Sequence, residues 1–436
     1  MFDQTDIQRL FLKNNYIKDQ WENLLLDSGI QKKQIEDFQH LDQTLGIYHK
    51  EKLVGTVSYQ NNVIKYIAVS EKYKDGGHTF NVLVSAIIQA MSQQEIFHYI
   101  VFTKPRYQKS FNFLGFETIV STPKIAVLEM GDSSIKQYLE RIPKVNGEKK
   151  AAIVMNANPF TEGHYYLVKQ AANNNDWVYV FVLEKEQNLF STKDRLKLVQ
   201  QGLQKLKNVI VLSGGEYIIS PATFPTYFLR EDDEIAKEQM VVDATLFKER
   251  IATYLDISAR YVGEEPLSPM TRSYNDILET ILPPEIKVYV LARKKTEQHQ
   301  VISASQVRKA YLAGQLEKIK YMVPETTYQY LKNKRERYVM EINKSAIDGT
   351  LESSDVQIMI SPNTEGIEID LDSQVIEQFG KQIKKVIYDT LAVYQIKNVK
   401  LKVVDKGALD CVIVARLKTA IHRSLGIQHQ ETPWEV

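Results

Sequence analysis

The stretch Ala151-Ala152-Ile153-Val154-Met155-Asn156-Ala157-Asn158-Pro159-Phe160-Thr161-Glu162-Gly163-His164 decides the fold of the central part of the chain. Its first five residues are an apolar run of strand length, and apolar residues in 165–172 then recur at helical spacing. Further strand candidates lie at 177–183, 209–212 and 288–291, and helical segments such as 193–206 and 244–255 lie between them. This alternation predicts an α/β fold with a doubly wound parallel sheet.

The loop after the first strand is the expected ligand site, because ligands of open α/β sheets bind at the carboxyl ends of the strands. Gly163 is expected to let the backbone pack tightly where the next helix begins. A helix N-terminus offers unpaired N–H groups and a partial positive charge to an anion. We therefore expect His164 to face phosphate groups, although a histidine at a helix start can also be a simple cap.

A second polar segment, Ile302-Ser303-Ala304-Ser305-Gln306-Val307-Arg308, has the chemistry of an anion site. Paired serines at a helix start supply hydroxyl and backbone donors, and an arginine one turn later supplies a planar fork that suits phosphate oxygens. Arg293, Lys294 and Lys295 precede it and either line a triphosphate path or form a solvated basic loop.

The two segments resemble the two motifs of the nucleotidyltransferase superfamily, (His/Thr)-x-Gly-His and Ile-Ser-x-(Ser/Thr)-x-x-Arg. A closer resemblance, to citrate lyase ligase, extends over about residues 1–335. It is carried by the segments 156–166, 215–220, 223–225, 263–266 and 302–308. Glu162 departs from the family pattern, in which leucine is common, and we expect its side chain to face solvent.

The resemblance implies an acid–thiol ligase that acetylates the thiol of the citrate lyase carrier through acetyl adenylate, with acetate and ATP consumed and AMP and pyrophosphate released. It implies Mg²⁺ bridging the β and γ phosphates, with no protein metal ligand assigned. His164 and Arg308 would be catalytic. The ATP-binding residues would be Asn156, Asn158, Thr161, Gly163, Arg293, Ser303 and Ser305.

Residues 1–140 alternate strand and helix patterns and end in Phe111-Asn112-Phe113-Leu114-Gly115-Phe116. A strand at 67–69, a glycine turn and a helix at 82–91 resemble the acyl-CoA-binding turn of the N-acetyltransferase superfamily, which makes Gly76 and Gly77 candidate cofactor-binding residues. Asp75 and Thr79 depart from that pattern, since one adds negative charge and the other adds bulk. The alternative is that the two glycines only form a tight turn.

The third part of the chain, residues 340–436, follows a charged helical segment at 328–337. Residues 341–377 contain nine Asp or Glu residues and only one lysine, whereas lysines are frequent after 381. This change in charge along the sequence indicates a separate domain. The runs 349–355 and 404–411 resemble the acyl-carrier (gamma) subunit of citrate lyase, with a small α+β fold. The resemblance implies a phosphoribosyl-dephospho-coenzyme A arm on Ser353, with Ser354 as the alternative. The fusion could also be a readthrough or frameshift product.

The 436 residues are therefore expected to form three domains, at 1–140, 145–335 and 340–436. The 55 basic and 54 acidic residues nearly cancel, which argues against a nucleic-acid partner, and no apolar run is long enough for a membrane span. Citrate lyase subunits and acetate are the expected partners, in the cytoplasm. The single cysteine, Cys411, is expected to be a buried structural thiol.

Two other functions share these patterns. A nucleotidyltransferase that keeps the adenylate in a dinucleotide cofactor would use the same two motifs. A non-catalytic scaffold of the lyase complex would keep the carrier and lose the ligase site, but all six motif positions are intact, which argues against it. The loop at 217–229 is expected to be ordered and close to the site.

Overall fold

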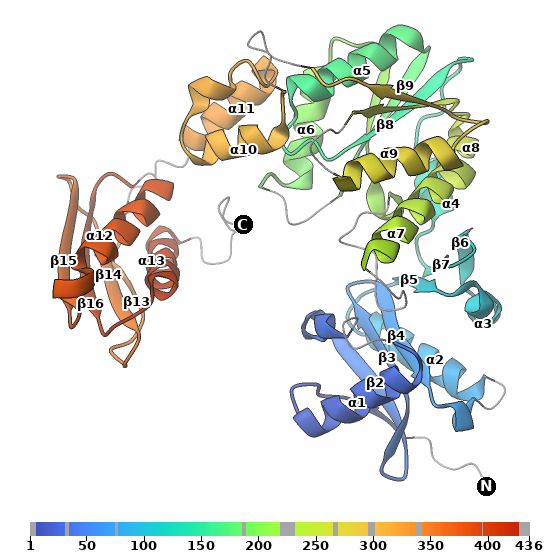
Figure 1. Ribbon diagram of the computed structural model, residues 1–436, viewed down its shortest axis with the longest axis horizontal. Helices are drawn as coiled ribbons and strands as arrows, with labels where there is room; N and C mark the ends of the chain where they lie inside the picture. The colour runs from blue at the N-terminus through green and yellow to red at the C-terminus, as the bar shows by residue number, and fades with distance from the viewer. Residues whose placement is uncertain are drawn as a thin grey trace. The chain divides into compact units, whose positions relative to one another are not determined.

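The computed structural model describes residues 6–30, 35–74, 77–184, 189–218, 232–264, 269–294, 301–336, 342–394 and 396–426. They form two compact units, one of residues 1–156, 167–185 and 206–293, the other of residues 157–166, 186–205 and 294–436. The described part of the chain contains three sheets (Figure 1). The predicted boundaries near residues 140–145 and 335–340 stay predictions. Within the described ranges, no helix has both the length and the apolar character to cross a membrane.

The first unit begins with a seven-stranded sheet in the order β1-β2-β3-β4-β5-β7-β6, in which β4 and β5 are parallel and all other neighbours antiparallel. The strands are β1 Asp6–Arg9, β2 Gln43–His49, β3 Lys52–Gln60, β4 Val63–Val69, β5 His98–Thr103, β6 Glu117–Ser121 and β7 Ala126–Gly131. The helices are α1 Asn15–Asp27, α2 His78–Ser92, α3 Gln108–Phe113 and α4 Ile135–Glu140. This arrangement confirms the alternation of strands and helices predicted for this part.

Strands β4 and β5 separate soon after they meet. They pair only at Val63 with Ile100 and at Ile64 with Val101. A β-bulge at Tyr66, where φ is +52°, lies just beyond these pairs and increases the local twist of β4. The later residues of the two strands therefore diverge, and a cleft opens between them.

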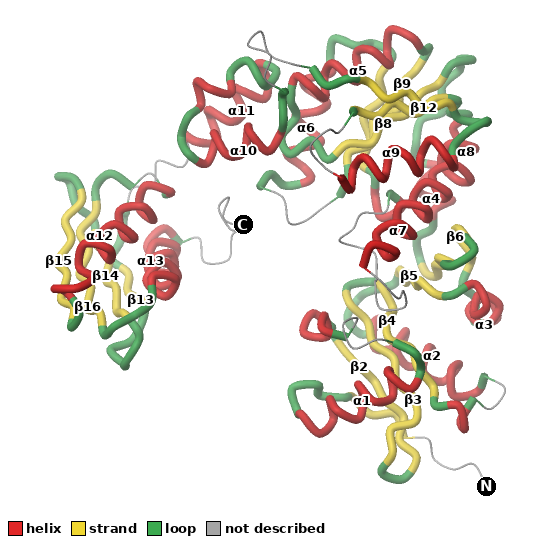
Figure 2. Tube along the Cα trace, in the orientation of Figure 1, coloured by secondary structure: helices red, strands yellow, loops and turns green. Residues whose placement is uncertain are grey.

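The second sheet of this unit has five parallel strands in the order β10-β9-β8-β11-β12. They are β8 Lys150–Met155, β9 Trp177–Val182, β10 Val209–Ser213, β11 Ala259–Gly263 and β12 Lys287–Leu291. The associated helices are α5 Glu162–Asn174, α7 Asp232–Leu246, a π-helix Phe247–Ala252, α8 Thr253–Leu255 and α9 Pro269–Ile281 (Figure 2). The predicted parallel, doubly wound sheet is confirmed, and β11 is a strand that the sequence analysis did not predict.

A polar cluster joins the two sheets of the first unit and is buried except at Glu216. His98, at the start of β5, lies with Nδ1 2.7 Å from Glu216 Oε2 and Nε2 3.1 Å from Glu129 Oε2. The Tyr217 hydroxyl also donates to Glu129, at 2.7 Å. Glu129 belongs to β7, while Glu216 and Tyr217 follow β10. Burial by itself lowers the pKa of His98, but the hydrogen bonds to the two carboxylates outweigh it and raise this pKa to about 9.

Stability of this unit is expected to fall as the pH rises from 6.5 through about 9, because the folded pKa of His98 lies above the ordinary value of 6.5. The contribution is complete below pH 6.5 and amounts to about 3 kcal/mol, at about 1.36 kcal/mol per pKa unit. Urea unfolding of wild type and His98→Gln at pH 6.5 and 9.5 measures it. A wild-type protein that loses no more stability than His98→Gln over this interval would contradict the expectation.

The second unit contains helices α6 Thr192–Leu203, α10 Ala304–Leu312 and α11 Glu325–Glu336, with a short 3₁₀ helix Leu316–Ile319. They enclose an apolar core made of Phe190, Val307, Tyr311, Ile319, Val323, Tyr328 and Leu331. Ser191 begins α6 and Ser303 begins α10 as N-caps, since each side chain accepts a backbone N–H of the first turn. The predicted helices at 193–206 and 328–337 are thus present with shifted ends.

The C-terminal part of the second unit is a four-stranded sheet with two helices. Its order is β13-β14-β16-β15, with β15 and β16 parallel. The elements are β13 Ala346–Asp348, β14 Val356–Ser361, β15 Ile367–Ser373, α12 Ile376–Val393, β16 Val399–Asp405 and α13 Asp410–Leu425 (Figure 1). Alternate residues of β14 and β16 are buried, so α12 and α13 cover one face. The predicted small α+β fold is confirmed.

Candidate adenylation site and carrier serine

The first motif begins where β8 ends, and β8 is the strand at which the order of the parallel sheet reverses. β9 and β10 continue the sheet on one side of β8, and β11 and β12 continue it on the other. In such sheets ligands bind outside the carboxyl ends of the strands beside this switch point. The sheet topology therefore favours the loop at 156–161 as a binding site.

The hydrogen bonds of Thr161 fix the ring of His164. The Thr161 N–H donates to His164 Nδ1 at 3.0 Å, and the Thr161 hydroxyl oxygen accepts from the His164 N–H at 3.3 Å. Because Nδ1 accepts a hydrogen bond, the neutral imidazole carries its proton on Nε2. The buried Phe160 ring stacks on the imidazole at 5.8 Å between centroids. His164 is thus held as an N–H donor at Nε2.

Space for the Phe160 ring comes from Gly202 on α6. A Cβ at Gly202 would lie 2.5 Å from Phe160 Cε1, which is closer than atoms can approach without a shift. Gly163 differs from the prediction, because a Cβ there would meet Thr161 Oγ1 at 3.6 Å and the Ile302 carbonyl at 3.7 Å, both ordinary contacts. Packing within the protein therefore does not require glycine at position 163.

The first turn of α5 offers few unpaired N–H groups. Glu162 N–H donates to the Met322 carbonyl at 2.9 Å, and the Thr161 and His164 amides form the bonds given above. In the described residues, the Gly163 N–H is the amide of this turn without an acceptor. A phosphate oxygen can approach an unpaired amide closely only where the residue there is small, as Gly163 is.

Arg308 links the second motif to the first. Its Nη1 donates to the Asn158 carbonyl at 2.7 Å, and its Nη2 donates to Ser305 Oγ at 3.1 Å. Partial burial lowers the pKa of the guanidinium from its usual value, although arginine remains charged in proteins. Ser303 caps α10 by accepting the N–H groups of Ser305 and Gln306.

The second unit therefore brings together Asn158, Thr161, Gly163, His164, Ser303, Ser305 and Arg308. Asn156 and Arg293 belong to the first unit, where Arg293 Nε donates to the Glu264 carbonyl at 2.9 Å. The grouped residues supply an imidazole donor, a guanidinium and an open backbone amide. Such a set can stabilise the negative charge on a phosphoryl group under nucleophilic attack.

The predicted attachment serine lies on a turn between β13 and β14. Ser353 is exposed, and the neighbouring Ser354 has a left-handed backbone with φ +63° and donates its N–H to the Lys406 carbonyl at 2.9 Å. Gly349 starts the turn with φ +91°, and a Cβ there would lie 1.8 Å from the Val356 carbonyl oxygen. Glycine is therefore required at position 349.

The side chain of Asp355 stabilises this turn through hydrogen bonds. Its carboxylate accepts from the Thr350 N–H and hydroxyl, from the Val356 N–H, and from Arg416 Nε and Nη2 at 3.1 and 2.9 Å. The hydrogen bonds from Arg416 are the main reason that the pKa of Asp355 lies well below its usual range. Arg416 comes from α13, far along the sequence, and sequence reasoning missed it.

Comparisons with known proteins place two parts of the chain in families. Residues 150–331 match the family model of the citrate lyase ligase C-terminal domain, and residues 343–424 match the model of the malonate decarboxylase delta subunit. The chain is 36% identical to the [citrate (pro-3S)-lyase] ligase of Escherichia coli (strain K12) over 65% of this chain and 82% of that protein. The chain belongs to the citrate lyase ligase family.

A second ligase of the family, from Klebsiella pneumoniae, is 34% identical over 72% of this chain and 94% of that protein. The C-terminal segment is 57% identical to the citrate lyase acyl carrier protein of Oenococcus oeni, over 22% of this chain and 99% of that protein. This member of the citrate lyase ligase family therefore carries a citrate lyase acyl-carrier domain in the same chain.

The N-terminal part of this ligase-family chain contains a cleft of about 640 Å³ where β4 and β5 diverge. Its lining is apolar on the strands and on Phe80 and Phe111, and basic at Lys74, Lys104, Arg106 and Lys109. Gly77 also lines it and is the N-cap of α2, with φ +95°. Gly76 lies outside the described residues. Thr79 is buried, with its methyl group 3.4 Å from a Cβ built on Gly55, so its bulk faces β3.

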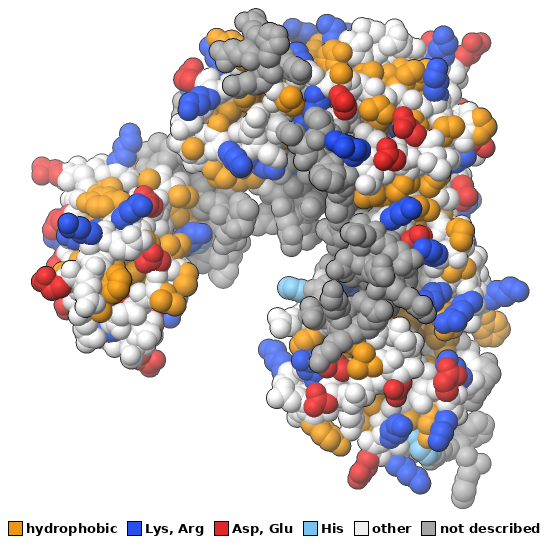
Figure 3. Space-filling model, viewed as in Figure 1, with side chains coloured by type: hydrophobic (Ala, Val, Ile, Leu, Met, Phe, Trp, Pro, Cys, Tyr) orange, Lys and Arg blue, Asp and Glu red, His pale blue; other side chains and the backbone are white. Residues whose placement is uncertain are grey.

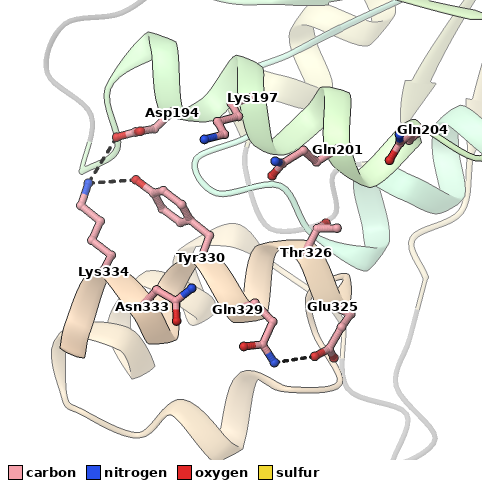
Figure 4. Close-up of a pocket in the computed structure, with 10 residues that line it drawn as sticks. All are labelled: Asp194, Lys197, Gln201, Gln204, Glu325, Thr326, Gln329, Tyr330, Asn333 and Lys334. Atoms are coloured by element: carbon pink, nitrogen blue, oxygen red, sulfur yellow. Dashed lines mark hydrogen bonds and ion pairs between the residues drawn. The ribbon is translucent and has the colours of Figure 1, made fainter. Parts of the chain in front are cut away.

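A groove of about 850 Å³ separates α6 from α11 in the second unit (Figure 4). Lys334 closes one end by binding Asp194 at 3.3 Å and the Tyr330 hydroxyl at 3.0 Å. Gln329 donates to Glu325 at 2.7 Å toward the other end. Its lining residues have polar or charged side chains, and none of them is a predicted site residue.

Two predictions for this family member need correction or remain open. Cys411 is exposed rather than buried, because the buried stripe of α13 starts at Ile413 and Cys411 lies outside it. Most of the loop predicted at 217–229 lies outside the described residues. On the face drawn in Figure 3, basic and acidic side chains are interspersed, in keeping with the near-zero net charge.

Proposed function

We propose that the chain activates acetate with ATP and transfers the acetyl group to the thiol of a citrate lyase carrier, as an acid–thiol ligase. The observation that carries the proposal is the grouping of Thr161, His164, Arg308 and the open Gly163 amide at the end of β8, in a chain of the citrate lyase ligase family. The named activity of the relatives supports the choice of acid and acceptor.

In the proposed reaction a carboxylate oxygen of acetate attacks the α-phosphorus of ATP, and the bond to the bridging oxygen of pyrophosphate breaks. His164 donates its Nε2 proton as a hydrogen bond to an oxygen that gains negative charge. Arg308 and the Gly163 N–H add fixed positive charge that needs no rearrangement at the moment of reaction. The thiol then displaces AMP from the acetyl carbonyl. Asn156, Asn158, Ser303, Ser305 and Arg293 are proposed to position ATP.

Mg²⁺ is expected to accompany ATP and neutralise its β and γ phosphates. Mg²⁺ takes most of its ligands from phosphate and water in such sites. The protein would therefore hold the metal chiefly through the nucleotide.

The carrier domain is proposed to bear the phosphoribosyl-dephospho-coenzyme A arm on Ser353. Two observations support this: Ser353 is exposed, and its turn is shaped by the hydrogen bonds of Asp355 and by the backbone of Gly349. The cleft between β4 and β5 is proposed to receive the coenzyme A-like part of such an arm, with apolar walls for the pantetheine chain and basic side chains for phosphate. Gly77, which lines the cleft, would contact it there.

Pyrophosphate release from ATP tests the function. The full chain, with Cys411→Ser so that the arm supplies the only thiol, is incubated with ATP with and without acetate. We expect acetate-dependent pyrophosphate and free AMP, and mass spectrometry should find acetyl on the arm. Pyrophosphate release without acetate, or an adenylyl group retained in a larger product, would contradict the ligase and favour a cofactor-forming nucleotidyltransferase.

A further inference from the structure

Glu162 and Lys294 form an ion pair next to Gly163, one of the proposed ATP-binding residues. Lys294 Nζ lies 2.7 Å from Glu162 Oε2, and the two side chains are 38% and 25% exposed. Both backbones are fixed nearby, because Glu162 N–H donates to the Met322 carbonyl and Ile302 N–H donates to the Lys294 carbonyl at 3.2 Å. The expectation that Glu162 simply faces solvent is therefore incomplete.

The position of this carboxylate is unusual for a site that receives a polyanion. Glu162 is the first residue of α5, where the helix dipole favours negative charge, and it adjoins the open Gly163 amide. A triphosphate would bind to the same three features, which are the helix N-terminus, a nearby ammonium and an unpaired N–H. The carboxylate of Glu162 thus stands in for the charge that a phosphate would bring.

We propose that Glu162 is a built-in counter-anion that holds Lys294 until the triphosphate of ATP displaces it. Lys294 then exchanges the Glu162 carboxylate for a phosphate oxygen. This proposal rests on the adenylation function proposed above and adds a residue that sets the affinity for the triphosphate. The free energy needed to break the Glu162–Lys294 ion pair reduces the free energy of ATP binding. The released carboxylate also repels the phosphates. Glu162 therefore weakens binding of ATP and of the pyrophosphate product.

A partly exposed ion pair contributes little to folding, so its partners can be replaced without unfolding the chain. Glu162→Gln keeps the size and hydrogen-bonding capacity of the side chain and removes only the charge. Lys294→Gln removes the charge on the other side. Adenosine is the matched control ligand, because it carries the base and the ribose but no phosphate.

Equilibrium binding of ATP and of adenosine to the full chain is the test, with wild type, Glu162→Gln, Lys294→Gln and the double variant. We expect Glu162→Gln to bind ATP about three- to tenfold more tightly and adenosine within about twofold of wild type, the size expected when one partly screened charge pair is removed. Lys294→Gln should weaken ATP binding. Added to Lys294→Gln, Glu162→Gln should have a smaller effect than alone, since the two residues are coupled.

An unchanged or weaker affinity of Glu162→Gln for ATP overturns the proposal. So does an equal change for adenosine, because that would show a structural effect on the pocket rather than an exchange of charge partners. A wild-type chain that binds no ATP overturns the adenylation function itself. The wild-type titration, read first, therefore separates the two failures.

Discussion

Replacing His164 with alanine is expected to lower the rate of acetate-dependent pyrophosphate release by about 10²- to 10³-fold, the usual cost of removing one preorganised donor from a developing negative charge. The physical reason is that Thr161 fixes the imidazole as an Nε2–H donor. The loss should appear in kcat more than in the KM for ATP, since the hydrogen bond strengthens as charge develops. Single-turnover assays measure it.

Two further variants test the tautomer on which this prediction depends. The amide nitrogen of His164→Gln can reach the place of Nε2, whereas the shorter His164→Asn can mimic only the position of Nδ1. We expect His164→Gln to recover part of the activity and His164→Asn to recover almost none. Equal activities of the two, in proteins with wild-type circular dichroism, would contradict the assignment of His164 as an Nε2 donor. Near-normal activity of a folded His164→Ala would remove His164 from the mechanism.

Replacing Ser353 with alanine is expected to abolish attachment of the prosthetic arm and, with it, acetylation of the chain's own carrier domain. The effect is all or none because a phosphodiester needs the hydroxyl oxygen. Intact-mass measurement of protein made in cells that modify the wild-type chain reads the result directly. Acetate-dependent pyrophosphate release should persist if a separate thiol carrier is supplied.

The matched control is Ser354→Gly, which removes the neighbouring hydroxyl. Ser354 has φ +63°, a conformation that glycine adopts without strain, so the turn should keep its shape or become more stable. We expect Ser354→Gly to carry the arm as wild type does. An arm on Ser353→Ala together with none on Ser354→Gly would move the attachment site to Ser354.

The parallel sheet was predictable because most of its strands can be recognised from their own residues. β8 and β9 are buried along nearly their whole length, so their sequences are continuous apolar runs. β11 was missed because it contains Arg260, a residue type that rarely lies in a core. The structure buries this arginine over the ring of Phe247, at 4.3 Å to the centroid, in a contact between distant segments.

In the candidate sites too, contacts between residues close in sequence were predictable and contacts between residues far apart in sequence were not. The motif at 161–164 is a local cap, and Thr161 and His164 are close enough in sequence for their hydrogen bonds to follow from the helix start alone. Arg416 reaches Asp355 across 61 positions, and Lys294 reaches Glu162 across 132. No spacing rule connects such residues, because only the packing of their elements brings them together.

The sequence by itself determined the class of each part, the strand that leads into the site, and the serines, glycine, histidine and arginine of the motifs, because periodicity, caps and turns are properties of neighbouring residues. The tertiary structure alone decided the exposure of Cys411, the charged His98 between Glu129 and Glu216, and the pairing of Glu162 with Lys294. These depend on burial and on contacts between distant segments, and both arise only when the elements pack.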